Sequence, residues 1–265
     1  MYNYKAGFVG AGNMGSSLAN AICKNCGGNN VIISCKGLDN AKKIAKKLGC
    51  NYGTSDEVVK NSKFVFLGVK PQNIKIVAMD LKDAFNENKE CIIVSMIAGV
   101  TIDKLESLFG KRKIIRIMPN TSTVIGEGMT LMCSNSLATE ELKEFEEIMS
   151  MSGAVDSIPE ELIDAGTAVS GCGPAFVYMF IDALAEGGIK CGLTKDKALK
   201  YASQALLGSA KMVLETGINP DDLKNAVCSP GGSTIEGVHK LEKGNFKDIT
   251  MDAVLSSYQK TKKLG

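Results

Sequence analysis

The sequence has no tryptophan, one histidine (His239) and two arginines (Arg112 and Arg116) among its 265 residues. Its 31 basic and 29 acidic side chains leave a net charge of only +2. Binding to nucleic acid or to an anionic membrane relies on clustered positive charge, so this near balance argues against both partners. The scarcity of arginine disfavours recognition of a phosphate backbone further.

Long apolar runs are also missing. No run reaches the ~18–20 residues of a membrane-spanning helix, and the start, MYNYKAGFVGAGNMG, lacks the charged-then-apolar layout of a signal peptide. We therefore expect a cytoplasmic protein. The nine cysteines are scattered and odd in number, which fits reduced thiols better than a disulfide set. Cys23 and Cys26 form a Cys-x-x-Cys pair, but no second pair accompanies them and no metal site is expected.

Short β-rich runs alternate with helical patterns from residue 5 to about 155. The runs predicted to be strands are KAGFVG, VIIS, FVFLGV, CIIVSMIA, KIIRIM and EGMTLMCS. Such alternation is typical of βαβ units and a mostly parallel sheet. The fold class is therefore α/β, with a Rossmann-type domain over residues 1–159.

Strand-like runs vanish from about residue 160. Helical patterns cover residues 174–191, 194–215, 234–241 and 246–263. We expect Met179, Phe180 and Leu184 on the first of these helices to be core residues. The second domain is thus predicted to be all-α, over residues 160–265.

The segment Gly10-Ala11-Gly12-Asn13-Met14-Gly15 matches G-x-G-x-x-G after the first predicted strand and at the start of a helix. Its glycines let the backbone approach a pyrophosphate, which then lies at the helix N-terminus. The alternative is a tight strand-to-helix turn without a ligand. The position within a βαβ pattern favours dinucleotide binding.

The end of the second predicted strand indicates which dinucleotide. NAD sites usually carry an acidic residue about 20 positions after the glycines, but this strand ends Ser34-Cys35-Lys36. Ser34 can hydrogen-bond a 2′-phosphate and Lys36 can neutralise it, so NADP(H) is preferred and NAD(H) is the alternative. Lys36 could instead be a solvated lysine on a lysine-rich surface.

Later strands end in segments that should face the same cofactor, because ligands bind at the carboxyl edge of such sheets. These segments are 68–72, 95–99 and 116–120. Met118 is expected to pack on a nicotinamide. Each segment alone could be an ordinary strand-end turn, but together they indicate a cofactor crevice.

Two unusual clusters lie in the helical half. Ser170-Gly171-Cys172-Gly173-Pro174 would allow close approach of a ring or a backbone, or would simply begin a core helix. The stretch VCSPGGSTIEGVHKLE places a Pro-Gly-Gly turn before a helix, where free N–H groups can hold an anion such as a carboxylate. Ile235, Val238 and Leu241 of that helix are expected to be core.

The motifs GAGNMG, VKPQ, RIMPNT, VSGCGPAF and VCSPGGSTIEGV, in this order, resemble the pyrroline-5-carboxylate reductase family from about residue 5 to the C-terminus. The resemblance implies reduction of 1-pyrroline-5-carboxylate to L-proline with NAD(P)H, usually NADPH, in the last step of proline synthesis. It also implies a homodimer formed by the helical domain, often within a decamer.

The resemblance assigns site residues by position. Cofactor-binding residues would be Gly10, Gly12, Asn13, Met14, Ser34, Lys36, Val69, Lys70, Pro71, Met96 and Ala98. The substrate carboxylate would be held by Ser229, Gly231, Gly232 and Ser233, and the ring nitrogen by the catalytic Thr234. Cys172 departs from the serine usual in the family, which puts only a hydroxyl contact in doubt.

A cyclic imine can arrive already protonated, so a strong general acid is not required, and His239 is expected to face solvent. A β-hydroxyacid dehydrogenase is the nearest alternative, but it would use a helix lysine, and no lysine lies between Lys143 and Lys190. A non-catalytic NADP-binding sensor is a second alternative. A sensor function would not explain why the Ser-Pro-Gly-Gly-Ser-Thr turn is intact.

Overall fold

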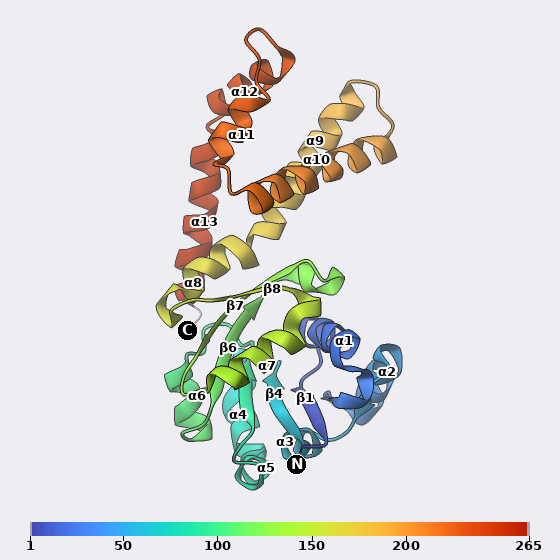
Figure 1. Cartoon of the computed structure of the whole chain (residues 1–265), viewed down its shortest axis with the longest axis vertical. Coiled ribbons are helices and arrows are strands. Elements are labelled where there is room, and N and C mark those ends of the chain that lie inside the picture. Colours follow the sequence, from blue (N-terminus) through green and yellow to red (C-terminus); the bar gives the residue numbers. More distant parts are fainter. Residues whose placement is uncertain (1, 264–265) are drawn as a thin grey trace. The chain divides into compact units, whose positions relative to one another are not determined.

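The computed structural model describes residues 2–263, which divide into two compact units (Figure 1). The first unit comprises the chain up to Cys172 together with the residues from Ser257 onward, and the second comprises Gly173–Ser256. The division expected from the sequence, after residue 159, falls before this boundary. Residues 160–172 pack with the sheet because Ile163 and Ala168 are fully buried.

The first unit is built on an eight-stranded sheet of order β3-β2-β1-β4-β5-β6-β7-β8. The strands are β1 (Tyr4–Val9), β2 (Val31–Ser34), β3 (Asn51–Tyr52), β4 (Ser62–Leu67), β5 (Ile92–Ser95), β6 (Ile114–Pro119), β7 (Gly128–Ser134) and β8 (Gly153–Ser157). All neighbours are parallel except β6 and β7, which are antiparallel. The mostly parallel sheet is confirmed, and β3 and β8 are strands that the sequence did not indicate.

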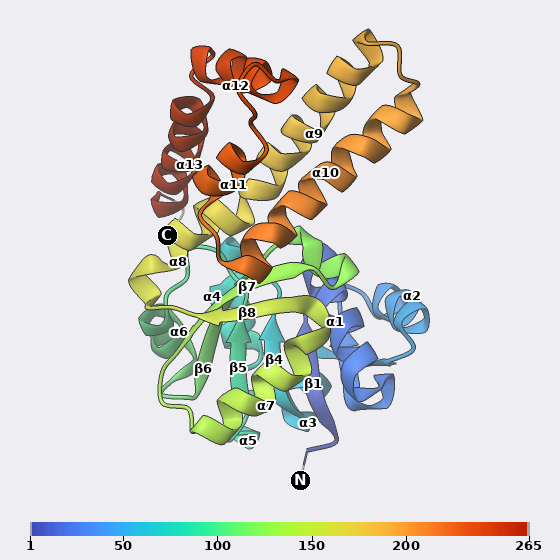
Figure 2. The same ribbon diagram turned by 45° about the horizontal axis from the view of Figure 1, so that its top comes forward.

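Helices cover both faces of this sheet (Figure 2). They are α1 (Asn13–Cys26), α2 (Leu38–Leu48), α3 (Ser55–Asn61), α4 (Ile74–Asp80), α5 (Lys82–Glu87), α6 (Ile102–Phe109), α7 (Thr139–Met149) and α8 (Ile163–Gly166). Along β4 the fully buried side chains alternate, since Phe64 and Phe66 join the core under α1 and α7 whereas Val65 and Leu67 join the core under α3 to α6. This alternation follows from the period of two along a strand.

The second unit is helical, as predicted. It contains α9 (Gly173–Lys190), α10 (Lys195–Thr216), α11 (Pro220–Ala226), α12 (Ser233–Lys243) and most of α13 (Phe246–Lys262). The helices α9 and α10 pack against each other around the small buried side chains Ala185, Ala198 and Ala202. The sequence therefore located four of these helices, and it did not indicate α11.

The predicted core of these helices is largely wrong. Met179 is 73% exposed and Leu184 is 43% exposed, whereas Phe180 is half-buried against Phe246 with ring centroids 5.4 Å apart. On α12, Leu241 is 44% exposed and Ile235 is only half-buried. An apolar helical face predicts burial, but no other element among residues 2–263 covers these faces.

Residues Glu160–Lys190 form a helical run that is long and apolar enough to cross a membrane, by length and composition alone. Its most apolar 18-residue window has a mean hydropathy of 1.4, and 11% of that window is buried. This segment contains no uninterrupted apolar run of that length, so the sequence pattern did not indicate it. Surface helices that pair with another copy of a chain have the same composition.

Candidate active site

Three glycines shape the turn between β1 and α1. Gly10 has φ +92°, and a Cβ there would lie 2.7 Å from the carbonyl oxygen of Gly68. A Cβ on Gly15 would lie 2.7 Å from the carbonyl oxygen of Gly10. Gly12 differs, because its φ is −70° and nothing lies within 4 Å of its Cβ position. The first and third glycines are therefore required by packing, and the second leaves open space in front of the helix.

That space adjoins the N-terminus of α1. Gly12 is the N-cap residue and provides no side-chain cap, so the first amides of the helix are not capped by it. Asn13 is exposed and Met14 is half-buried. A pyrophosphate approaching Gly12 would meet amide donors and the positive end of the helix dipole. The residues present fit a dinucleotide.

The turn is joined to two further loops at the carboxyl edge of the sheet. The amide of Gly68 donates to the carbonyl of Val9 over 2.9 Å, and the amide of Met96 donates to the carbonyl of Leu67 over 3.3 Å. These bonds bring Val69, Lys70 and Pro71, and then Met96 and Ala98, to the edge that carries the glycine turn. The expected cofactor loops are brought together, except that Met118 is only 9% exposed and packs in the core.

Ser34 is placed differently from the expectation. It is 1% exposed, and its hydroxyl donates to the carbonyl of Phe8 over 3.1 Å and lies 3.1 Å from the hydroxyl of Ser55. Its carbonyl accepts the amides of Gly10 and Ala11. Ser34 therefore holds the glycine turn against β2, whereas the side chain of Lys36 is exposed.

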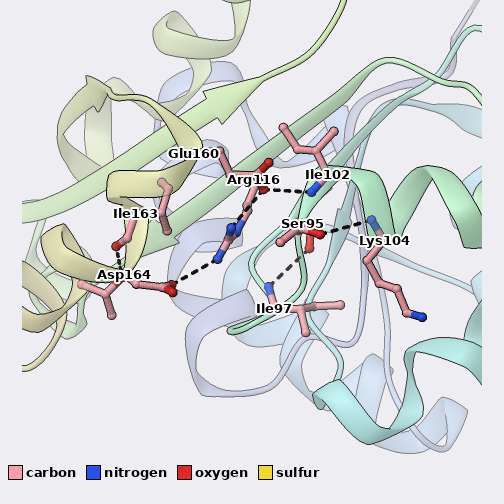
Figure 3. A network of polar contacts seen from close by, with 10 residues as sticks. Ser95, Ile97, Ile102, Lys104, Arg116, Glu160, Ile163 and Asp164 are labelled. Carbon is pink, nitrogen blue, oxygen red and sulfur yellow. Dashed lines mark hydrogen bonds and ion pairs between the residues drawn. The ribbon is translucent and has the colours of Figure 1, made fainter. Parts of the chain in front are cut away.

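Arg116 is the centre of a polar network that the sequence did not reveal (Figure 3). The side chain is 3% exposed and donates to Glu160 over 3.0 Å and to Asp164 over 3.5 Å. Glu160 also accepts the amide of Ile102 over 2.8 Å, at the first turn of α6. The network fixes the end of β6 to residues 160–164 and to α6, and no sequence spacing relates partners 44 and 48 residues apart.

Asn120, directly after β6, ties this edge to the second glycine-rich cluster. Its side-chain amide donates to the carbonyl of Ser170 over 3.0 Å, and its side-chain oxygen accepts the amides of Ser122 and Met129, each over 3.2 Å. Ser170 lies in a π-helical segment, Thr167–Gly171. Such segments occur often at functional sites.

The thiol of Cys133 is not a candidate nucleophile. Burial raises the pKa of Cys133, opposite Arg116 in the β6–β7 pair, to about 11. The thiol is therefore protonated at neutral pH, and a protonated thiol is a poor nucleophile.

Arg112, the other arginine, donates to backbone carbonyls, among them those of Phe85 and Asn88. Both arginines thus serve the fold.

The turn before α12 has the geometry that its sequence predicts. The amide of Gly232 donates to the carbonyl of Ser229 over 3.0 Å, and Gly231 has φ +70°. Proline at the second position and a positive φ at the third define a type II turn. Ser229, Gly231, Ser233 and Thr234 are exposed, and the glycine N-cap of α12 provides no side-chain cap. The turn therefore presents N–H groups for an anion.

The Rossmann sheet, its glycine turn and the exposed apolar helices define a class: a dinucleotide-binding protein with an associating helical half. Family models agree. Residues 160–264 match pyrroline-5-carboxylate reductase dimerisation, and residues 5–99 match NADP oxidoreductase, coenzyme F420-dependent.

Curated relatives match over the whole length. The pyrroline-5-carboxylate reductases of Arabidopsis thaliana and Aquifex aeolicus are each 39% identical, covering 99% and 98% of this chain and 96% and 97% of theirs. That of Escherichia coli is 37% identical and covers 98% of both chains. The chain belongs to the pyrroline-5-carboxylate reductase family.

Solved structures show the same fold. Pyrroline carboxylate reductase of Plasmodium falciparum, crystallised with NADP bound, is 33% identical with a TM-score of 0.87 over 100% of this chain and 99% of that one. The Coxiella burnetii enzyme is 31% identical with a TM-score of 0.90 over 99% of both chains.

The contrast between Gly12 and Gly15 gives a test of the cofactor turn. We expect Gly12→Ala to weaken binding of a nicotinamide cofactor about tenfold or more, roughly 1.4 kcal/mol, while leaving the melting temperature unchanged, because no protein atom lies within 4 Å of the added Cβ and only an incoming ligand would contact it. Gly15→Ala should lower both affinity and melting temperature. Isothermal titration and thermal unfolding measure the two effects. Equal melting temperatures with equal affinities in wild type and Gly12→Ala would show that no ligand approaches this glycine.

Arg116 gives a test of the buried network. Arg116→Met should destabilise the first unit by about 3–5 kcal/mol in urea unfolding, because Glu160 and Asp164 lose the cation that neutralises them. The variant Arg116→Met/Glu160→Gln should regain part of this loss, since one uncompensated carboxylate is removed. A double variant no more stable than Arg116→Met would show that the charge of Glu160 is not what destabilises the single variant, because glutamine still accepts the amide of Ile102.

Proposed function

We propose that this protein reduces 1-pyrroline-5-carboxylate to L-proline with NADPH, the last step of proline biosynthesis. Similarity to pyrroline-5-carboxylate reductases along the whole chain is the observation that carries the proposal, since both the cofactor half and the helical half are matched. The fold is an independent support, with TM-scores of 0.87 and 0.90 to two such enzymes.

The cofactor is proposed to bind along the carboxyl edge of the sheet. Gly10, Gly12, Asn13 and Met14 hold the pyrophosphate at the start of α1; Val69, Lys70 and Pro71 lie along the ribose; and Met96 and Ala98 lie on the nicotinamide side. When bound, the reduced nicotinamide supplies the hydride. Lys36, exposed after β2 and without an acidic neighbour in Ser34-Cys35-Lys36, favours the 2′-phosphate of NADP over NAD.

The substrate is proposed to bind at the turn before α12. The uncapped amides at the start of α12, directly after Gly231 and Gly232, hold the carboxylate together with the hydroxyls of Ser229 and Ser233, and the positive end of α12 stabilises its charge. The hydroxyl of Thr234, one residue into the helix, positions the ring nitrogen. A cyclic imine is protonated by solvent before it binds, so these residues need only orient it and exclude water.

The helical half is proposed to form a homodimer, with higher assembly into a decamer as the finer expectation, and the protein is proposed to act in the cytoplasm. Support comes from the match to a dimerisation model and from side chains such as Leu214, 83% exposed, and Met179, 73% exposed. Size-exclusion chromatography with light scattering distinguishes a monomer, a dimer and a decamer. The Glu160–Lys190 run would then be covered by a second copy.

The deciding experiment measures oxidation of NADPH by the purified full-length protein with 1-pyrroline-5-carboxylate, and L-proline as the product. A parallel reaction with a 3-oxo acid tests the β-hydroxyacid dehydrogenase alternative. Turnover of the imine alone supports the proposal. NADPH binding without turnover of either substrate would favour a cofactor-binding sensor.

Thr234 gives the sharpest test of the substrate turn. Thr234→Ala should lower kcat about 10- to 100-fold, roughly 1.4–2.8 kcal/mol, with the Kd for NADPH unchanged, because only the ring nitrogen loses its partner. Thr234→Ser keeps the hydroxyl and should retain most activity. Steady-state kinetics and fluorescence titration of NADPH check both. If Thr234→Ala turns over at the wild-type rate, Thr234 lies outside the site.

Lys36 gives a test of cofactor preference. Lys36→Ala should raise the KM for NADPH about tenfold and leave the KM for NADH unchanged, because only NADPH carries the 2′-phosphate that the ammonium neutralises. Lys43→Ala, on α2 and also exposed, is the matched control and should change neither value. Equal effects of Lys36→Ala on both cofactors would identify Lys36 as an ordinary surface lysine.

A further inference from the structure

A cavity of about 480 Å³ lies between α4, α5 and the end of α6 in the first unit, whose helices are labelled in Figure 1. This volume is within the ~300–1,000 Å³ of typical small-molecule sites. Its lining shares no residue with the site proposed for the cofactor. Arg112, which is part of the lining, precedes β6 and bonds to Asn88 before β5, so it lies at the amino edge of these parallel strands. The glycine turn lies at the opposite, carboxyl edge.

The inner wall of the cavity is apolar. Phe85 and Phe109 are both buried in the core, and their rings meet edge to face with centroids 5.0 Å apart. Ala78 of α4 is buried as well, whereas Met79 is 76% exposed and forms part of the outer wall. An apolar group that entered the cavity would remove this surface from water, which is favourable.

All the charged side chains of the lining are cationic. They are Lys75 of α4, Lys82 of α5 and Arg112, and the lining contains no carboxylate. Among residues 2–263, none of these three cations takes part in an ion pair. Charges of one sign along a low-dielectric wall attract an ion of the opposite sign. The cavity is therefore complementary to an anion that also carries an apolar group.

The acidic residues next to the lining are bound to other partners. Glu87 follows the lining residue Asn86, and its carboxylate pairs with Lys60 of α3 over 2.8 Å. Glu106 precedes the lining residue Ser107 and accepts the side-chain amide of Asn135 over 2.8 Å. These contacts hold both carboxylates on groups outside the lining, so the positive charge of the cavity is not neutralised by them.

Arg112 is fixed in place by neutral partners. Its Nε donates to the carbonyl of Phe109 over 3.0 Å, and its Nη2 donates to that of Phe85 over 2.6 Å. Its Nη1 donates to the carbonyls of Asn88 and Lys89 over 3.1 and 3.3 Å. A guanidinium has five N–H groups, so these four bonds leave one N–H and the whole positive charge without an anionic partner.

We propose that this cavity binds a small monocarboxylate that carries an apolar chain or ring. The apolar part would lie on Phe85 and Met79, and the carboxylate would accept the remaining N–H of Arg112 and contact the ammonium groups of Lys75 and Lys82. A phosphate fits less well, because arginine binds phosphate through two parallel N–H groups and most of these are used by carbonyls here. The site does not depend on the reductase activity proposed above.

The test measures binding of octanoate to the full-length protein by calorimetry. Acetate carries the charge without the chain, and octanol carries the chain without the charge. We expect octanoate to bind about tenfold or more tightly than either, since only octanoate satisfies both walls of the cavity.

The two lysines are tested by charge reversal. Lys75→Glu/Lys82→Glu should weaken octanoate binding about tenfold or more and leave the melting temperature unchanged, because both side chains are exposed and unpaired. Lys42→Glu/Lys46→Glu, on α2, is the matched control. It changes the net charge equally at exposed lysines outside the lining and should leave the affinity within about twofold.

A tryptophan reporter locates the bound ligand. The sequence has no tryptophan, so Ser107→Trp places a single one in the lining of the cavity. Octanoate with a bromine atom at the end of its chain should quench this fluorescence. Lys47→Trp, at an exposed position of α2, should keep its fluorescence. The comparison distinguishes the cavity from the exposed apolar helices of the second unit, which also attract an apolar chain.

Several outcomes would overturn the proposal. Equal affinities for octanol and octanoate would show that the cations take no part, and equal affinities for acetate and octanoate would show that only surface charge is involved. Equal quenching of Ser107→Trp and Lys47→Trp, or equal effects of the two charge reversals, would place the ligand elsewhere. The absence of octanoate binding would show that the cavity is closed in solution or covered by a second copy. None of these measurements uses turnover, so they are independent of the test of the proposed function.

Discussion

The backbones of two loops meet at the centre of the first unit so closely that no side chain fits between them. A Cβ on Gly68 would lie 2.4 Å from the carbonyl oxygen of Gly10, and a Cβ on Gly10 would lie 2.7 Å from the carbonyl oxygen of Gly68. These residues follow the adjacent strands β1 and β4. The Sδ atom of Met96, after β5, lies 3.5 Å from the same Gly68 position. This contact brings together the loops after β1, β4 and β5, which are proposed to bind the cofactor.

Buried packing beneath the loops keeps the contact in place. The rings of Phe8 and Phe66 stack with centroids 4.4 Å apart, one on β1 and one on β4. Such pairs stabilise by about 0.5–1.5 kcal/mol beyond the area that they bury. The hydroxyl of Ser34, on the other side of β1, donates to the carbonyl of Phe8. The glycine turn is thus held by rigid strands rather than by its own side chains, which are small enough to allow the proposed approach of a pyrophosphate.

Local sequence patterns predicted most of the fold, because each pattern reflects the structural preference of one short segment. Apolar runs predicted the buried strands, and the glycine turn predicted the start of α1. The strand β3 was missed because Asn51 and Tyr52 carry no apolar signal, and β8 because most of its side chains are exposed. The contacts of Arg116 and the burial of Ser34 depend on segments brought together only by the sheet. No spacing along the chain could have revealed them.

The misassigned core of the second unit has a different physical origin. The buried side chains of its helices α9 and α10 are alanines, and α11 and α12 bury no residue within the described chain. Such sparse burial cannot offset the entropy of ordering these helices, which costs about 1–2 kcal/mol per residue for the backbone alone. The missing apolar contacts must come from a second copy, as the match to a dimerisation model indicates. Association would then be a condition of folding, since such chains often have no stable folded monomer. Because Thr234 lies on α12, the geometry of the turn proposed to bind the substrate would depend on the dimer as well.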